Sequence, residues 1–203
     1  MFNIGNSKKY KAYDLNKLTK KVRHSVSEHR FVHTLGVAYT AAALAMRYEY
    51  DINHAMTAGI LHDCAKSMTE GDLIKWCEKN KMDITDVERL NPSLLHAKVG
   101  SIIAEKKYGV KDTEIISAIK YHTTGKPDMT TLEKIIYIAD YIEPNRKELE
   151  GIAEIRKIAF TDIDKALLMI LKSSLTYLKE KGSLIDSLTQ ETYDFYFKET
   201  VSE

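Results

Sequence analysis

The chain has 203 residues, of which 44% are hydrophobic and 29% are charged, and its formal net charge is +1. That length suits one sizeable domain. The balanced charge gives no reason to expect nucleic-acid binding, and the two cysteines are too few for a disulfide framework. The longest apolar run, Tyr39 to Met46, is too short to span a bilayer. We therefore expect a soluble cytoplasmic protein with no membrane or nucleic-acid partner.

Helical periodicity dominates the chain, and alternating strand-like runs are missing. We predict an all-α helical bundle of about ten helices, forming a single domain over residues 1–203. Its motifs fall within about residues 28–146, and the helices of residues 148–200 are expected to serve packing or an interface, which allows a homodimer. The predicted helices cover residues 14–24, 28–50, 53–65, 70–80, 92–108, 112–121, 131–142, 148–159, 162–181 and 187–200.

Capping chemistry supports several of these boundaries. Asn53 is expected to cap the helix of residues 53–65, and Thr69 with Asp72 resembles a capping box for the next helix. Pro92 stands at a first helical position.

The most informative feature is the adjacent pair His62 and Asp63, which interrupts the otherwise apolar segment 58–66. A buried imidazole beside a carboxylate is costly unless something compensates it. A metal ion would do so, because neutral imidazole and carboxylate are both ready ligands. Cys64, which follows directly, is interpreted as a small buried residue.

Four more residues of ligand type stand in similarly apolar surroundings: His33, His96, His122 and Asp140. Asp140 is the strongest of these, because a carboxylate inside a run of isoleucines and tyrosines needs a cation nearby. An ion pair with a distant lysine or arginine is the alternative for this aspartate. A satisfied core position is the alternative for each lone histidine.

Several side chains near these candidates are suited to an anion. Arg30 shares a helical face with a candidate histidine, Lys66 follows the His-Asp pair by one turn, and Thr123 and Arg146 flank the remaining candidates. The alternatives are an exposed helix terminus for Lys66 and a solvated loop for Arg146. A surface position is the simpler interpretation of the three remaining histidines: His24, His29 and His54.

In this order, the motifs resemble the HD-domain superfamily of metal-dependent phosphohydrolases, whose signature is a histidine, an adjacent His-Asp pair and a distant aspartate. The wider pattern is similar to the bacterial YqeK-type family of symmetrical dinucleoside tetraphosphate hydrolases, which split diadenosine tetraphosphate into two ADP. The similarity covers about residues 30–146, and residues 189–195 match only loosely. The motifs are Arg30-Phe-Val-His33, His62-Asp-Cys-Ala-Lys66, Asn91-Pro-Ser-Leu-Leu-His96-Ala, His122-Thr-Thr-Gly125 and Ile138-Ala-Asp-Tyr-Ile-Glu-Pro-Asn-Arg146.

The resemblance implies an HD-type helical fold with an iron site. By position, the principal metal would be held by His33, His62, Asp63 and Asp140, and a second metal or the phosphates by His96 and His122. The resemblance further implies phosphate contacts from Arg30, Lys66, Thr123 and Arg146. Asp63 is a metal ligand that also orients water against the substrate, and together with Lys66 it makes up the catalytic set. Ligand chemistry alone fits iron, manganese, cobalt, nickel or zinc about equally, in one ion or two.

The implied reaction is hydrolysis in which metal-activated water attacks an inner phosphorus of the dinucleotide. One alternative is an HD-type enzyme acting on deoxynucleotides, cyclic dinucleotides or guanosine alarmones. Another is a nucleotide-sensing metal protein that binds without turnover, and the plainest is a helical adaptor whose histidines are incidental.

Overall fold

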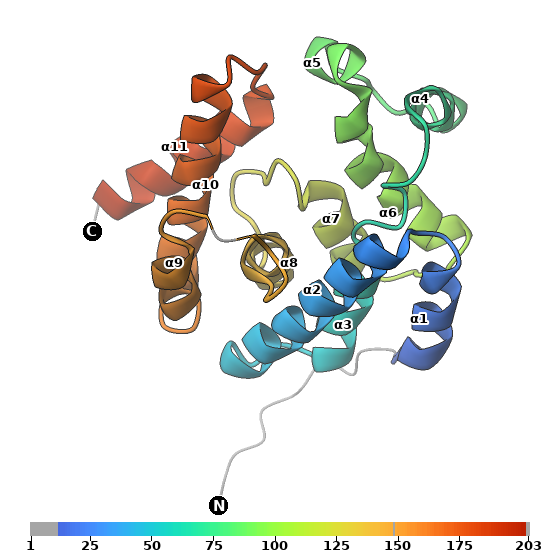
Figure 1. The fold of residues 1–203 in the computed structure, drawn as a ribbon, viewed down its shortest axis with the longest axis horizontal. Helices are drawn as coiled ribbons and strands as arrows, with labels where there is room; N and C mark the ends of the chain where they lie inside the picture. Colours follow the sequence, from blue (N-terminus) through green and yellow to red (C-terminus); the bar gives the residue numbers. More distant parts are fainter. Residues whose placement is uncertain (1–11, 148, 202–203) are drawn as a thin grey trace, which may run out of the picture.

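The computed structural model describes residues 12–147 and 149–201, which fold into eleven α-helices and one short 3-10 helix, with no strand among them (Figure 1). The prediction of an all-α bundle is confirmed. The elements are α1 (Leu15–Arg23), α2 (Glu28–Arg47), α3 (Ile52–Leu61), α4 (Glu70–Lys79), α5 (Asp86–Leu90), η1 (Pro92–Leu95), α6 (His96–Lys106), α7 (Thr113–Tyr121), α8 (Thr131–Ile142), α9 (Ile152–Ile158), α10 (Ile163–Glu180) and α11 (Ser187–Val201).

Helix α8 is the centre of the bundle. Its residues 135–139 are all buried, so it is apolar on every side and must be enclosed by other helices. It packs against α2, α3 and α7 and also against α9 and α10, which lie on its other side in Figure 1. The surrounding helices therefore hold the residues at the end of α8 in place.

Helices α2 and α3 approach each other closely at a glycine. A Cβ atom on Gly59 of α3 would lie 2.8 Å from the Cα atom of Ala38 on α2, which is too near for any side chain. This contact fixes the end of α3, where the His-Asp pair lies, against the helix that carries His33.

The last helix, α11, contacts the connection between α7 and α8. Gly125 in that connection has a φ of +67°, and a side chain there would run into Thr192 of α11. Tyr196, also on α11, accepts a hydrogen bond of 2.7 Å from the backbone N–H of Met129. Helix α11 thus holds the loop that follows His122.

Several predicted boundaries are wrong. The helix expected over residues 53–65 runs from Ile52 to Leu61, and its cap is Asp51, which accepts from the N–H of His54. Asn53 instead exchanges hydrogen bonds with the backbone of Tyr13. A cap must lie just outside the first turn, and Asn53 lies inside it.

Two further segments differ from the prediction. The helix expected over residues 92–108 is broken into η1 and α6, and the helix expected over 148–159 is the shorter α9, which begins after Gly151 at a φ of +77°. Residue 148 lies outside the described residues. The short helix α5 was not predicted; it is held by a capping box between Thr85 and Glu88.

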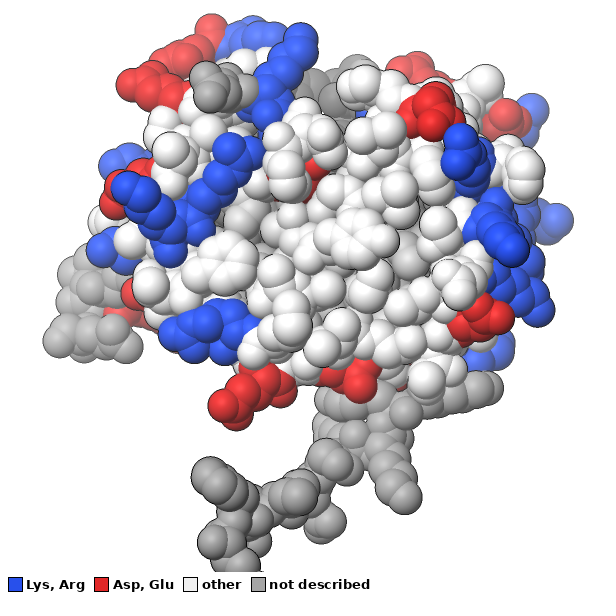
Figure 2. Space-filling model, turned by 60° about the horizontal axis from the view of Figure 1, so that its bottom comes forward, with Lys and Arg blue, Asp and Glu red and all other residues white. Residues whose placement is uncertain are grey.

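In the described part of the chain, none of the helices combines the length and hydropathy needed to cross a lipid bilayer. Figure 2 shows one face of the molecule, with a broad uncharged area in its centre and lysine and arginine side chains along its edges. On this face the basic residues do not gather into a central patch.

Candidate active site

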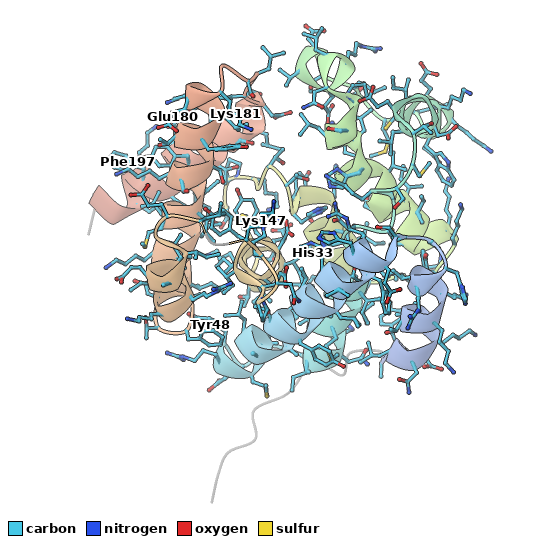
Figure 3. The ribbon with its side chains drawn as sticks, in the orientation of Figure 1. His33, Tyr48, Lys147, Glu180, Lys181 and Phe197 are labelled. Atoms are coloured by element: carbon cyan, nitrogen blue, oxygen red, sulfur yellow. The ribbon has the colours of Figure 1, made fainter. Side chains whose placement is uncertain are left out.

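Five helices meet at one place, and each supplies a ligand-type side chain. Helix α2 contributes His33, which is labelled in the interior of Figure 3, and the remaining candidates come from the ends of α3, α7 and α8 and the start of α6. The imidazoles and Asp63 are buried, while the Asp140 side chain is 21% exposed. The candidates that the structure brings together are His33, His62, Asp63, His96, His122 and Asp140.

The sequence had suggested that the His-Asp pair lies inside a helix. In the structure it lies just after one. His62 is the C-cap residue of α3, and its Nδ1 donates to the carbonyl of Gly59 over 2.7 Å. That carbonyl would accept from the amide of Asp63 if the helix continued. The chain instead continues in turns with bonds three residues apart, such as Lys66 N–H to Asp63 carbonyl at 3.0 Å. The imidazole therefore caps the end of its own helix.

Two other histidines repeat this arrangement. His122 caps α7 and donates from Nδ1 to the Ile119 carbonyl over 2.7 Å, and His96 does the same to the Ser93 carbonyl over 2.6 Å. A carbonyl oxygen only accepts, so each of these Nδ1 atoms carries the proton. Each Nε2 then presents a lone pair, which is the form in which histidine binds a metal.

His33 also uses its Nδ1 in a hydrogen bond, but its partner is a side chain rather than a backbone carbonyl. Its Nδ1 lies 3.1 Å from Oε1 of Glu143, a buried carboxylate at the end of α8. An ionised carboxylate also only accepts, so Nδ1 donates and Nε2 is left with its lone pair.

The free nitrogens converge on two carboxylates. Nε2 of His33 lies 3.0 Å from Oδ1 of Asp140, and Nε2 of His62 lies 3.8 Å from the same atom and 3.5 Å from Oδ2 of Asp63. Neither Nε2 atom has a hydrogen-bond partner among the described residues, although both are buried. His33, His62 and Asp140 each offer a ligand atom within 4.8 Å of the others, so these residues fit a single divalent cation.

A second group of donors lies beside the first. Nε2 atoms of His96 and His122 lie 3.3 and 3.5 Å from Oδ1 of Asp63, and 3.2 Å from each other. Two lone pairs at that separation repel unless a cation or a proton lies between or beside them. His62, Asp63 and His122 also form a possible ligand group, and His62 is thus shared by both groups.

The histidines keep both carboxylates ionised. Burial alone would raise the pKa of Asp63, but the neighbouring His62 and the close contacts with His122 and His96 hold it well below its usual range. The pKa of Asp140 is likewise lowered against the effect of burial, chiefly by His33. Both side chains are therefore charged at neutral pH, which is the form in which a carboxylate binds a metal.

Two predicted anion contacts lie at this cluster. Arg30 donates from Nη1 to Oδ2 of Asp63 over 2.8 Å. Nζ of Lys66 lies 3.2 and 3.3 Å from the two ring nitrogens of His96, and burial lowers its pKa. Lys66 is therefore not the exposed helix terminus that was its alternative.

The other two predicted anion contacts are Thr123, which directly follows His122, and Arg146. The Oγ1 atom of Thr123 is buried and has no hydrogen-bond partner among the described residues. Arg146 is half-buried, and together with Arg30 and His33 it lines a cavity of about 620 Å³. Lys147, also labelled in Figure 3, lines this cavity too and was not singled out from the sequence.

Of two further expectations about single residues, one is wrong and one is confirmed. His54 was expected at the surface but is fully buried, with Tyr13 packed on its ring and Asp112 3.9 Å away. It lies in the first turn of α3, which is enclosed by α1, α2, α7 and α8. Cys64 is buried as expected, and burial raises the pKa of its thiol to about 12, so it is no nucleophile.

Sequence reasoning missed Glu143 as part of the site. It is 1% exposed, yet it stands just before Pro144 and Asn145, a context typical of a solvated loop. The one available signal was its position after an apolar helix that already carried Asp140 one turn earlier.

Residues 30–145 match the HD domain family, a span that contains all six ligand candidates. The chain belongs to the HD domain family. It is 41% identical over 174 residues to "Bis(5'-nucleosyl)-tetraphosphatase, symmetrical" of Bacillus subtilis strain 168, covering 86% of this chain and 92% of that one. The protein of the same name from Staphylococcus aureus strain NCTC 8325 / PS 47 is 34% identical over 185 residues, covering 90% and 94%.

A solved structure supports this membership. It is described as a "predicted HD superfamily hydrolase involved in NAD metabolism" from Clostridium acetobutylicum, and it is 39% identical with a TM-score of 0.89. The similarity covers 93% of this chain and 100% of that one, so it extends beyond the HD-domain match into the C-terminal helices. The resemblance stated from the motifs is confirmed.

Proposed function

We propose that this chain is a metal-dependent symmetrical bis(5'-nucleosyl)-tetraphosphatase, which hydrolyses diadenosine tetraphosphate to two ADP. The names of its relatives in B. subtilis and S. aureus support this activity. The observation that carries the proposal is the arrangement of four imidazoles, each with Nδ1 engaged and Nε2 directed at Asp63 or Asp140.

We assign the ligands as the sequence suggested. His33, His62, Asp63 and Asp140 would hold the principal cation, with iron as the first candidate and manganese, cobalt, nickel or zinc as the others. His96 and His122 would hold a second cation or contact phosphate. When bound, such a cation supplies Lewis-acid activation of water and neutralises phosphate charge.

The remaining side chains act on the substrate. Arg30, Lys66 and Arg146 are cations at the edge of the cluster, where they can bind the phosphate chain and stabilise its developing charge. The unpaired Oγ1 of Thr123 can donate to a phosphate or ribose oxygen. Asp63 accepts hydrogen bonds and can orient the attacking water, while the 21% exposure of Asp140 leaves that side of the cluster open to solvent.

Product analysis tests this proposal. Purified protein stripped of metal is loaded with Fe²⁺ under reducing conditions, or with Mn²⁺, Co²⁺, Ni²⁺ or Zn²⁺, and incubated with diadenosine tetraphosphate. We expect ADP as the sole nucleotide product, and no turnover in the metal-free sample. Release of AMP with ATP would contradict symmetrical cleavage. Faster turnover of a deoxynucleotide, a cyclic dinucleotide or a guanosine alarmone in the same assay would favour one of the alternatives.

A further inference from the structure

We propose that Glu143 is a positioning residue that fixes the His33 ring with its Nε2 directed at the cation, and that Gly36 leaves the room this requires. The inference rests on the metal centre of the proposed function. It adds a carboxylate that binds neither cation nor substrate but acts through a histidine.

The hydrogen bond of His33 differs from those of the other three imidazoles. They donate to neutral backbone carbonyls, whereas His33 donates to a carboxylate, Oε1 of Glu143, over 3.1 Å. A bond to a charged acceptor is stronger and makes the ring a better electron donor at Nε2. His33 also comes from the middle of a helix, so it has no free carbonyl at a helix end to hold it.

Glu143 is itself held in place on its other oxygen. Oε2 accepts from the backbone N–H of Asn145 over 2.8 Å and from its Nδ2 over 3.1 Å. Arg156 donates to the carbonyls of Ile142 and Glu143 over 2.9 and 3.0 Å, which fixes the backbone where α8 ends. The side chain is 1% exposed, and within the described residues its ion-pair partner is His33.

Gly36 supplies the space for this carboxylate. It lies one turn beyond His33 on α2, and a Cβ atom there would overlap Oε2 of Glu143 and lie 3.2 Å from Nδ2 of Asn145. A glycine inside a helix is less favourable than an alanine, so its presence here needs a reason, and the Glu143 carboxylate supplies one. Gly36 and Glu143, which are distant in sequence, thus both serve the hydrogen bond between Glu143 and His33.

The test is metal binding by the whole chain, independent of turnover. Metal-stripped wild type, Glu143→Gln and Gly36→Ala are titrated with Co²⁺, and binding is followed by the visible absorption of the bound ion against a competing chelator. Glutamine carries one oxygen and one NH₂, so it must set a donor against either His33 or Asn145. Losing the hydrogen-bond partner of a metal-binding histidine typically weakens metal affinity by about 10- to 100-fold. We expect this decrease in affinity in both variants, together with an altered Co²⁺ spectrum.

Two further variants separate positioning from general stability. Glu133→Gln changes an equally buried glutamate at the opposite end of α8, bound to Ser117 and Lys126, and should leave Co²⁺ affinity unchanged. Glu143→Asp keeps the charge and should recover part of the affinity lost in Glu143→Gln. Circular dichroism reports folding of each variant.

Wild-type affinity and spectrum in both Glu143→Gln and Gly36→Ala would overturn the inference while leaving the metal centre intact. Equal loss of affinity in Glu133→Gln would overturn it as well, because the effect would then be one of stability. Failure of the unsubstituted chain to bind Co²⁺ would overturn the metal centre itself.

Discussion

At the scale of single residues, the site depends on which ring nitrogen each histidine has already used. His62, His96 and His122 bond backbone carbonyls through Nδ1, and His33 bonds Glu143. The nitrogens left over lie near carboxylates whose pKa values are lowered by those same rings. Without a cation, the two carboxylate charges lie close to these nitrogens in a buried place, which favours protonation of His33 and His62.

Asp63 lies between the two pairs of imidazoles, with Oδ2 near His33 and His62 and Oδ1 near His96 and His122. Changing Asp63 to alanine should reduce turnover of diadenosine tetraphosphate by more than about 100-fold. Removing a metal ligand should cost more activity than removing the hydrogen-bond partner of a ligand, which typically costs about 10- to 100-fold. Circular dichroism should show that the helical fold persists. Turnover near the wild-type level would show that the assignment of Asp63 is wrong.

Lys66 should act on phosphate rather than on the cation. Changing Lys66 to alanine removes a charged hydrogen bond of about 1.5–3 kcal/mol, so we expect turnover to fall by about 10- to 100-fold. Metal content, measured by mass spectrometry, should stay at the wild-type value. Lys111→Ala, a change at a side chain that is 72% exposed, is the matched control and should leave turnover unchanged. A parallel loss of metal in Lys66→Ala would contradict the assigned role.

The convergence of most candidate ligands could be predicted from the sequence, because a polar residue inside an apolar run is costly to bury without a compensating partner. This holds for His62, Asp63 and Asp140, which the structure brings together. Glu143 could not be predicted, because its burial depends on Gly36, more than one hundred residues earlier, and no local pattern records that contact.

At the scale of helices, the ligands sit where elements begin or end. His62 and His122 stand at the ends of α3 and α7, and His96 begins α6. Periodicity predicted the existence of these helices but not their ends, because the imidazole of the C-cap residue, rather than a further backbone N–H, bonds a carbonyl of the last turn. This is why the helix expected to continue to residue 65 ends at Leu61.

The contact between α2 and α3 should control how His33 meets the His-Asp pair. Gly59→Ala places a methyl group 2.8 Å from the Cα atom of Ala38, and overpacking of this kind typically destabilises by about 1–3 kcal/mol. Urea denaturation measures the change. Gly71→Ala on α4, where nothing lies within 4 Å of the new atom, should be neutral or slightly stabilising. Equal effects at both glycines would contradict close packing at Gly59.

At the scale of the whole molecule, the C-terminal helices support the site without contributing ligands to it. Helix α11 packs Thr192 against Gly125 in the loop after His122, and Tyr196 holds Met129 before α8. The sequence predicted helices there and no chemistry, but it could not predict which loop they cover, since amphipathic periodicity does not identify a partner surface.

The pKa shifts of His33 and His62 predict how the stability of the metal-free protein depends on pH. Burial lowers the pKa of His33 and His62, but their carboxylate neighbours outweigh burial and the net shift is upward from 6.5. The folded protein therefore keeps protons that the unfolded chain has lost. This stabilisation is fully present below pH 6.5 and is lost as the pH rises through the folded-state values.

We therefore expect the Tm of metal-free protein to fall as the pH is raised from 6.5 towards about 8. Differential scanning calorimetry measures this slope. His62→Asn should flatten the slope, and His29→Asn, at an exposed histidine, should keep it. A Tm that rises with pH in this range would contradict the upward shifts.

The most direct test of the central claim is an anomalous-difference map from crystals of metal-loaded protein, recorded on both sides of the absorption edge of the metal. We predict a peak bounded by Nε2 of His33 and His62 and by carboxylate oxygens of Asp63 and Asp140. A map with no peak among these atoms, or with the metal bound only elsewhere on the chain, would contradict the account.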